Sequence, residues 1–408
     1  MKTVFWWTLG IILYTYLGYP VAIWILSRVH RRTWRIASIS PGLSIVLAVH
    51  NGIALLPGKL RHLLSLDYSH LREVIVVSDG SGDGTAEFLA RQQHPLLRTI
   101  ILEKHQGKAA ALNVGMAKAT ADIILFVDIR PEIQPGAVQR LISNFADPKV
   151  GCVAGELLLR REGHDTASAA VGGMYWSYEQ WIRTCESAFD SPVGVYGGFY
   201  AVRRELAVPQ PVGIILDDMF QPLSIIRQGY RSVLDPEAVV YDTWPGQIER
   251  EFQRKVRTLA GNFQLFQLAP WTLSLRNRVL FQLVSHKLLR LIVPYLGILL
   301  LVCTVALGVR SHFYAGVAVL ELLSLALALI GLFVRVSVLQ RIAGPASALL
   351  LLNAAAVVGF YRFLTTRGPL WKIWTSREAT STSAPPARES MAQFEAGVVA
   401  GPGGGRNV

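Results

Sequence analysis

The fold is decided by the stretch from Val74 to Ser81, which reads VIVVSDGS. A run rich in β-branched residues is typical of a buried strand, and this run ends in an acid, Asp79. The stretch from Ile123 to Asp128, IILFVD, repeats the pattern. Ligands in open α/β sheets bind outside the carboxyl ends of the strands, so we expect Asp79 and Asp128 to converge on one crevice.

Strand-like and helical runs alternate around these two stretches. The expected strands are Leu43–Val49, Glu73–Ser78, Arg98–Leu102 and Asp122–Val127, and the expected helices are Leu55–Ser65, Thr85–Gln93 and Lys108–Lys118. Such alternation predicts a mostly parallel sheet covered by helices on both faces. After Asp128 the pattern loosens, and we expect a strand at Val150–Leu159, helices at Met174–Glu186 and Glu249–Phe266, and a glycine-rich turn with a strand at Gly194–Val202.

The composition indicates a membrane protein. Of the 408 residues, 51% are hydrophobic and 17% are charged, whereas soluble domains carry roughly a quarter charged residues. The apolar residues gather in four runs, at Val4–Leu26, Leu288–Val309, Phe313–Val334 and Pro345–Leu364. Each run is close to the length of about 20 residues that crosses a hydrocarbon core, so we expect α-helical transmembrane segments.

The first run predicts a retained anchor rather than a cleaved secretory signal, because it is long and lacks a small-x-small cleavage pattern. Four arginines follow it, Arg28, Arg31, Arg32 and Arg35. Excess Lys and Arg beside a span stays in the cytoplasm, which places the next domain there. We expect a bacterial inner membrane, with the α/β domain on its cytoplasmic side.

The far end of the chain leaves the topology open. One anchor and three later spans put the tail outside, yet Arg362, Arg367, Lys372 and Arg377 follow the last run and favour a cytoplasmic tail. One apolar segment that does not fully cross the membrane is the alternative.

The net charge of +12 does not predict a nucleic-acid partner. Much of it lies near the ends of the apolar runs, where anionic lipids attract basic groups, and no zinc-finger spacing or RNA-binding signature is present. Cys152, Cys185 and Cys303 are too far apart for a metal set or a disulfide framework. Membrane lipids are therefore the expected partners of the basic residues.

These patterns divide the chain into five parts. We expect a membrane anchor at 1–37, an α/β domain at 38–267, an amphipathic interfacial helix at 268–288 centred on Trp271–Lys287, transmembrane helices at 289–364, and a basic and then disordered tail at 365–408.

Taken together, the motifs resemble those of the membrane-bound family-2 glycosyltransferases, the group that contains the cellulose, hyaluronan and poly-N-acetylglucosamine synthases. The resemblance covers about Leu43 to Lys287. It implies a GT-A-like, Rossmann-like domain and an inverting hexosyltransferase that uses a nucleotide-diphosphate sugar, with a UDP-sugar as the expected donor. It also implies a glycan or lipid-linked acceptor and a role in polysaccharide synthesis.

The resemblance assigns the donor site to residues in the first half of the domain. Asn51 follows the first strand where the nucleotide loop of the family begins, and Asp79 matches the acid that contacts the uracil-ribose end. A helix-capping role is the alternative for Asp79. Lys108 begins a helix, so its ammonium and the first backbone amides face a phosphate, unless it is a solvated surface lysine.

Asp128-Ile129-Arg130 occupies the place of the Asp-x-Asp metal motif of the family. Asp128 is the expected ligand of Mg²⁺ or Mn²⁺ beside the donor diphosphate, because hard cations prefer carboxylate and phosphate oxygens. The second acid of the motif is replaced by Arg130, which either contacts phosphate or points to solvent.

The resemblance assigns the acceptor chemistry to Asp217-Asp218, with Asp218 as the catalytic base and Asp217 orienting either Asp218 or the acceptor. Two acids at a helix start are the alternative. Arg254 and Arg257 share a helix face and suit the departing diphosphate, or else lie on anionic lipid. Thr258 stands where polymerising members carry a tryptophan. This departure keeps two rivals open, a non-processive lipid glycosyltransferase and a non-catalytic nucleotide-binding partner in an export complex.

Overall fold

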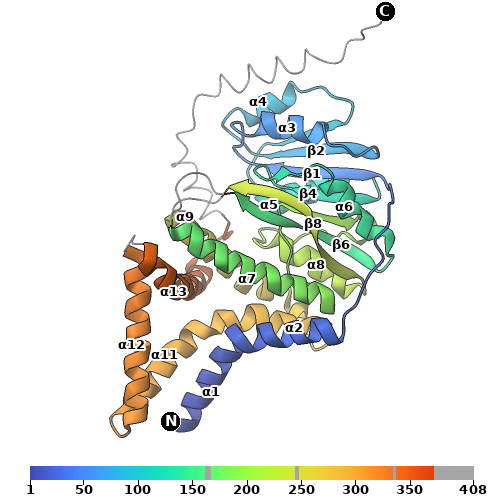
Figure 1. Cartoon of the computed structure of the whole chain (residues 1–408). Helices are drawn as coiled ribbons and strands as arrows, with labels where there is room; N and C mark the ends of the chain where they lie inside the picture. The colour runs from blue at the N-terminus through green and yellow to red at the C-terminus, as the bar shows by residue number, and fades with distance from the viewer. Residues whose placement is uncertain (161–166, 244–247, 334–336, 372–408) are drawn as a thin grey trace, which may run out of the picture.

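The computed structural model describes residues 1–160, 167–243, 248–333 and 337–371. An α/β domain lies against a group of long apolar helices, and the N-terminus lies at the end of that group farthest from the domain (Figure 1).

One sheet runs through the domain. In the described part of the chain it has eight strands in the order β3-β2-β1-β4-β7-β6-β8-β5. The strands are β1 (Leu43–Val49), β2 (Leu71–Asp79), β3 (Leu97–Leu102), β4 (Ile123–Val127), β5 (Glu132–Ile133), β6 (Val150–Arg160), β7 (Phe199–Arg203) and β8 (Arg231–Thr243). The first four pair in parallel, β7 is antiparallel to both β4 and β6, and β8 is parallel to β6. The mostly parallel sheet predicted from the sequence is confirmed.

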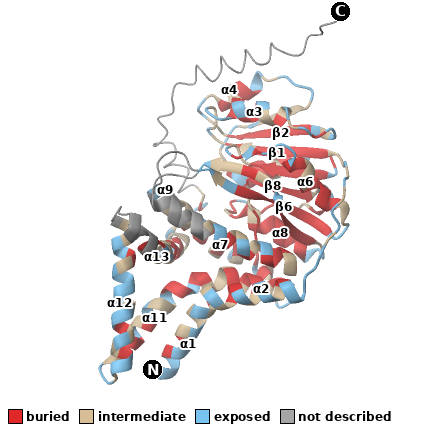
Figure 2. Ribbon diagram, in the orientation of Figure 1, coloured by how far each residue is buried: buried red, intermediate tan, exposed pale blue. Residues whose placement is uncertain are grey.

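Helices cover both faces of this sheet. They are α3 (Leu56–Leu64), α4 (Thr85–Ala90), α5 (Lys108–Lys118), α6 (Ala137–Ser143), α7 (Ala167–Phe189) and α8 (Asp217–Arg227), and α9 (Ile248–Leu268) follows. Leu60 of α3 packs with Val76 on one face, and Leu112 of α5 packs with Val77 on the other. Since successive strand residues point to opposite faces, both faces are buried, and the continuous apolar runs follow from this (Figure 2).

The sequence-based prediction missed β8. This strand contains Asp235-Pro236-Glu237, which reads as a turn, and proline cannot donate a hydrogen bond within a sheet. The structure places these residues where the pairing of β8 with β6 shifts register, between Ala154 and Glu156. The irregularity accommodates the proline within one long strand.

Four helices are long and apolar enough to cross a membrane, at Lys2–Val29, Leu280–Gly308, His312–Leu332 and Ala343–Thr365. They correspond to the four apolar runs of the sequence. The first is α1 (Lys2–Leu13) joined to α2 (Tyr19–Val29) by a π-helical turn, and the second is α10 (Leu280–Leu283) joined by a similar turn to α11 (Leu289–Gly308). The others are α12 (His312–Phe333) and the apolar part of α13 (Ser337–Thr365).

The single amphipathic helix predicted for Trp271–Lys287 is wrong. The segment holds a short 3₁₀ turn at Pro270–Leu273, a loop, and then the first turns of the second apolar helix, which begins at Leu280. The side-chain amide of Asn277 donates to the carbonyl of Thr272 at 2.6 Å and holds the loop. The predicted disordered tail from Thr375 lies outside the described residues.

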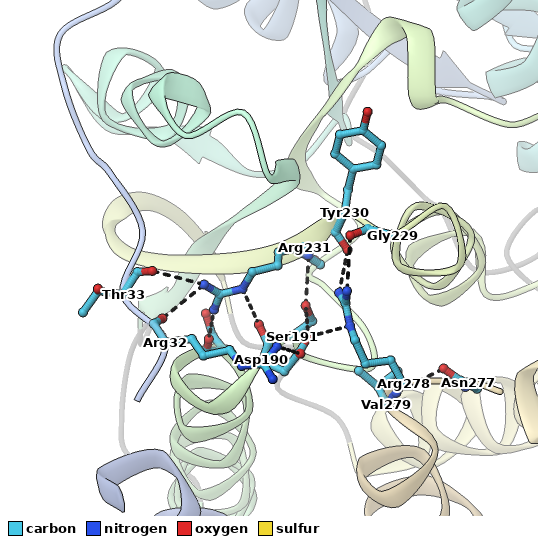
Figure 3. A network of polar contacts seen from close by, with 12 residues as sticks. Arg32, Thr33, Asp190, Ser191, Gly229, Tyr230, Arg231, Asn277, Arg278 and Val279 are labelled. Carbon is cyan, nitrogen blue, oxygen red and sulfur yellow. Dashed lines mark hydrogen bonds and ion pairs between the residues drawn. The ribbon is translucent and has the colours of Figure 1, made fainter. Parts of the chain in front are cut away.

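A network of ion pairs and hydrogen bonds joins the domain to the segments beside the first two apolar helices (Figure 3). The carboxylate of Asp190, at the end of α7, contacts Arg32 at 2.6 Å and Arg278 at 3.2 Å. Arg32 follows the first apolar helix and Arg278 precedes the second. Arg231 of β8 donates to the carbonyl of Asp190 at 2.9 Å and to that of Arg32 at 3.1 Å. The domain is therefore fixed to both helices at one point.

Candidate active site

Asp79 organises the loop before α5. Its buried carboxylate accepts hydrogen bonds from the backbone N–H groups of Gln106 and Gly107, each at 2.8 Å, and contacts His105 Nδ1 at 2.8 Å. Gly107 has a positive φ of 95°, which favours glycine. Both carboxylate oxygens are thus used to position this loop. Direct contact of Asp79 with a nucleotide stays a prediction.

The loop after β1 lies beside this loop. The ring of His50 stacks on that of His105, with centroids 3.7 Å apart, and the edge of Trp371 meets His105 at 4.3 Å. Asn51, predicted to begin the nucleotide loop, has a φ of 50° and accepts a hydrogen bond from the backbone of Gly82 at 2.9 Å. Asn51 therefore braces the turn after Asp79, while its neighbour His50 lines the cavity described below.

Lys108 brings three elements together. Its ammonium lies 3.0 Å from Asp128, which follows β4, and 3.4 Å from Asp217, which begins α8. Burial alone would lower the pKa of Lys108, but the carboxylates of Asp128 and Asp217 raise it above its ordinary value. Lys108 is therefore a fixed positive charge at the first turn of α5, where backbone amides also favour an anion.

Asp218 lies next to Lys108 and Asp217 and has the pKa of a base that works near neutral pH. Burial, together with the charge of Asp217, raises the pKa of Asp218 to about 7. A side chain at Gly197 would approach Asp218 to 3.0 Å, so the glycine lets this carboxylate lie close to the chain. The predicted acidic pair and its glycine-rich neighbour are brought together in one place.

The residues around Asp128 fit a divalent cation that is shared with a diphosphate. The Asp128 side chain is 39% exposed, whereas that of Asp217 is 7% exposed. Among the described residues, no group of three or more His, Cys, Asp or Glu side chains could hold a metal alone. Mg²⁺ is commonly bound by one or two carboxylates and completed by substrate phosphates, which is the arrangement available here.

The side chain of Arg130 is largely exposed, as one of the two expectations had it, and it also has a partner in the protein. Its guanidinium pairs with Asp242, at the end of β8, at 3.3 Å. Asp242 lines the same cavity as Asp128, so β8 supplies an acid near the position where the second motif acid is missing. Sequence reasoning missed Asp242 because it missed the strand that carries it.

Arg254 and Arg257 both line the cavity from α9, as the prediction of a shared face required. Arg254 pairs with Glu251 at 2.8 Å, while the side chain of Arg257 is exposed. The hydroxyl of Thr258, which also lines the cavity, donates to the carbonyl of Arg254 at 3.1 Å. Phosphate binding by the two arginines stays a prediction.

All these groups line one cavity of about 530 Å³, which has two chemically distinct ends. We call the first the acidic end and define it as Asp79, Asp128, Asp217, Asp218 and Asp242. We call the second the basic end and define it as Arg183, Lys255, Lys287 and Arg290, which come from α7, α9 and the second apolar helix.

Sequence reasoning missed the basic end. Trp176 and Glu179 of α7 also line the cavity there, although the spacing of the aromatic residues of α7 is typical of a core. Glu179 contacts Lys287 at 2.6 Å and Arg290 at 2.7 Å. The only sequence signal was the pair Glu179 and Arg183, four residues apart on one helix.

The comparisons with known proteins agree with this geometry. The family described as "Glycosyl transferase family 2" matches residues 44–207. This part of the chain is therefore similar to the family-2 glycosyltransferases. It holds Asp79, Lys108 and Asp128, and the matched segment ends before Asp217.

Similar proteins include poly-beta-1,6-N-acetyl-D-glucosamine synthases of two staphylococci. The chain is 25% identical to that of Staphylococcus aureus (strain COL) over 233 residues, which are 55% of each protein. It is 25% identical to that of Staphylococcus epidermidis over 282 residues, 65% of this chain and 66% of the relative. The chain thus spans about half the length of the Staphylococcus aureus relative.

Among solved structures, the chain resembles the mannosyltransferase PcManGT from Pyrobaculum calidifontis in complex with GDP-Man and Mn²⁺. The TM-score is 0.66 at 22% identity, over 88% of this chain and 99% of that one. At this identity the likeness concerns the fold, and it confirms the GT-A-like domain that the sequence predicted. The predicted apolar helices are the four described above. The chain is an integral membrane protein.

Proposed function

We propose that the protein is an inverting glycosyltransferase that moves a hexose from a nucleotide-diphosphate sugar, with a UDP-sugar as the expected donor. The acceptor is a glycan or a lipid-linked acceptor at the bacterial inner membrane, and the α/β domain is cytoplasmic. The observation that carries the proposal is Asp218, a carboxylate whose pKa is raised to about 7 beside Lys108 and Asp128.

In this reaction the acceptor hydroxyl attacks C1 of the sugar while Asp218 takes its proton. The bond between C1 and the diphosphate oxygen breaks, and the nucleoside diphosphate leaves with the electron pair. Displacement from the face opposite the leaving group inverts C1. Asp217 and Lys108 hold Asp218 in a fixed electrostatic environment, and Lys108 also faces the phosphates.

Asp128 would hold the cation, Mg²⁺ or Mn²⁺, whose charge neutralises the leaving diphosphate. The Pyrobaculum mannosyltransferase was solved in complex with GDP-Man and Mn²⁺, which supports a cation and a nucleotide-sugar donor for this fold. Arg254 and Arg257 approach the same cavity from α9 and suit phosphate oxygens, because guanidinium groups bind phosphate in a bidentate manner.

A single transfer to a lipid is the second candidate. The observation that favours it is Thr258, whose hydroxyl is turned back to Arg254 at the position where polymerising members of the family carry a tryptophan. The staphylococcal synthases favour polysaccharide synthesis instead. The length of the product distinguishes the two candidates.

The test is nucleotide release by purified protein in lipid nanodiscs from a panel of UDP- and GDP-sugars, with Mg²⁺, Mn²⁺ or EDTA and with lipid and glycan acceptors. We expect one donor to turn over in a cation-dependent way and Asp218→Asn to lose that turnover. Asp67→Asn, a change at an exposed acid, is the matched control and should behave as wild type. Donor binding without turnover under every condition would contradict the proposal and favour a non-catalytic partner.

A further inference from the structure

Two clusters mark the opposite ends of the apolar helices. Phe5, Leu300, Cys303 and Tyr314 pack together at the end far from the domain, where the chain begins and where α11 turns into α12. At the other end, Tyr19 and Ile23 of α2 pack against Ile182 of α7. The first two apolar helices therefore run between the domain and the far cluster.

The third apolar helix, α12, brings the chain back to the domain. It begins at the far cluster with Tyr314, and its 22 residues extend about 33 Å, the thickness of a hydrocarbon core. Near its end, the carbonyl of Ala328 accepts a hydrogen bond from Ser347 of α13 at 2.8 Å, and Gly331 faces Ala343. Thus α13 begins on the side of the membrane that holds the domain.

Helix α13 then lies along the domain instead of returning to the far cluster (Figure 1). A Cβ at Gly359 would lie 3.0 Å from the backbone nitrogen of Ala260, so the backbones of α13 and α9 nearly touch. The rings of Phe360 and Phe363 pack on Phe263 of α9, with centroids 4.9 and 5.9 Å away. Because α9 also carries charged residues of the cavity, placing it in hydrocarbon would cost free energy, and a position beside the domain avoids that cost.

The residues after α13 reach the acidic end of the cavity. Trp371 meets His105 edge-on at 4.3 Å and lies against Gly107, the residue before Lys108. Only five residues lie between the end of α13 at Thr365 and Trp371. The helix therefore both begins and ends on the domain's side.

We infer that α13, although long and apolar enough to cross a membrane, lies in the headgroup layer of the leaflet that faces the domain. Its outward side chains Leu349, Val357, Tyr361 and Leu364 are exposed and apolar, which suits the boundary between headgroups and acyl chains. Arg362 and Arg367 at its end suit anionic lipid headgroups. The surface that it offers is thus a binding surface for the bilayer itself.

This placement decides between the two topologies that the sequence left open, a tail outside the membrane and a tail on the cytoplasmic side. Within the described residues, the crossing helices are the helix at Lys2–Val29, the helix at Leu280–Gly308 and α12, so the chain passes through the membrane three times. The segment after α13 lies on the same side as the domain, which agrees with its arginines.

The first test is labelling of single cysteines in the full chain with a membrane-impermeant maleimide, in right-side-out and inverted vesicles. The three native cysteines are buried, so their background is low. We expect Glu205→Cys in the domain and Arg367→Cys after α13 to label in the same vesicles, and Arg310→Cys in the far turn to label in the opposite ones. Labelling of Arg367→Cys together with Arg310→Cys, or of all three from one side, would overturn the inference.

The second test measures the depth of α13 with spin labels at Leu349, Val357 and Leu364. These exposed positions span 15 residues, about 22 Å of helix, so a crossing helix would give them very different depths. An interfacial helix gives similar depths at all three. Leu320 and Leu329 of α12 are the matched control and should differ. Neither test requires activity, so the inference and the proposed function can fail separately.

Discussion

The acidic and basic ends of the cavity differ in how their charges are balanced. At the basic end, Glu179 is buried and in contact with Lys287, Arg290 and His286, the last at 3.0 Å. Burial alone would raise the pKa of Glu179, but these partners hold it well below its ordinary value. The carboxylate is therefore ionised and held between the domain and the second apolar helix.

At the acidic end, the carboxylates outnumber their partners. Lys108 is shared between Asp128 and Asp217, and the pKa of Asp218 is raised to about 7. Proton transfer is most efficient when the pKa of the catalytic group lies near the working pH, and this condition fits Asp218 better than Glu179. On the proposed function, this difference assigns the chemistry to the acidic end, and it assigns to the basic end the attachment of the domain to the second apolar helix.

The largest expected effect comes from Asp218→Asn. Removing the base should lower turnover by about 10²–10⁴-fold, because the acceptor hydroxyl then lacks a group to take its proton. Donor affinity should change little. Nucleotide release under saturating donor, together with calorimetric binding of the nucleoside diphosphate, measures both quantities.

Stability provides the control for this variant. The pKa of Asp218 is higher in the folded than in the unfolded chain. The folded state therefore loses stability as the pH rises from the ordinary aspartate pKa towards 7. The neutral amide removes that cost, so Asp218→Asn should unfold at a temperature no lower than wild type at pH 7. A variant that is inactive and also much less stable would mean that Asp218 is a structural residue.

The next effect should come from the basic end. Glu179→Gln leaves Lys287 and Arg290 without their buried carboxylate, and breaking such a group costs about 3–5 kcal/mol of unfolding free energy. Thermal unfolding in nanodiscs measures it, with exposed Glu249→Gln as the control. Because the pKa of Glu179 is lowered, its contribution is present at neutral pH and is lost as the pH falls below the ordinary glutamate range. An unchanged unfolding temperature would mean that Glu179 does not help to attach the domain to the second apolar helix.

A smaller effect is expected from Asp79→Asn. The amide oxygen can accept from only one of the two backbone N–H groups of Gln106 and Gly107, and its NH₂ group faces the other donor. A hydrogen bond to a charged group contributes about 1.5–3 kcal/mol, so KM for the donor should rise roughly 10–100-fold as the loop before Lys108 loosens. An unchanged KM with lower stability would mean that this loop does not contact the donor.

The sequence predicted the acidic end well because each of its motif residues ends a strand or begins a helix. Asp79 ends β2, Asp128 directly follows β4, and Lys108 begins α5 at the predicted residue. Apolar runs of buried parallel strands make these boundaries visible. Asp242 escaped notice because Pro236 interrupts its strand.

The basic end could not be predicted in this way. Arg183, Lys255 and Lys287 come from three helices that meet only in the folded chain. A lone lysine or arginine near an apolar run is read as a lipid-facing charge, and nothing in the local pattern distinguishes it from one that lines a cavity. The apolar composition of α13 predicted a span, and the structure has a helix there that is long and apolar enough to cross a membrane. Its packing on α9, on which the inferred interfacial position rests, could not be predicted from that composition.

The smallest effect should come from Arg130→Gln, which tests whether this residue belongs to the acidic end. Its side chain is 58% exposed, so losing the pair with Asp242 should cost less than about 1 kcal/mol of stability. Removing a positive charge near Asp128 should lower the cation concentration needed for half-maximal activity by up to about fivefold. A higher requirement for cation would instead mean that Arg130 helps to hold the phosphates.

The measurement that tests the account most directly is kcat/KM for nucleotide release as a function of pH, from 5 to 9, in nanodiscs. This ratio reports the ionisation of the free enzyme. With Asp218 as the base, kcat/KM should rise as the pH increases through about 7 and then level off. In Asp218→Asn the remaining activity should lose this rise. A flat profile for the wild type, or the same rise in the variant, would contradict the assignment of the chemistry to the acidic end.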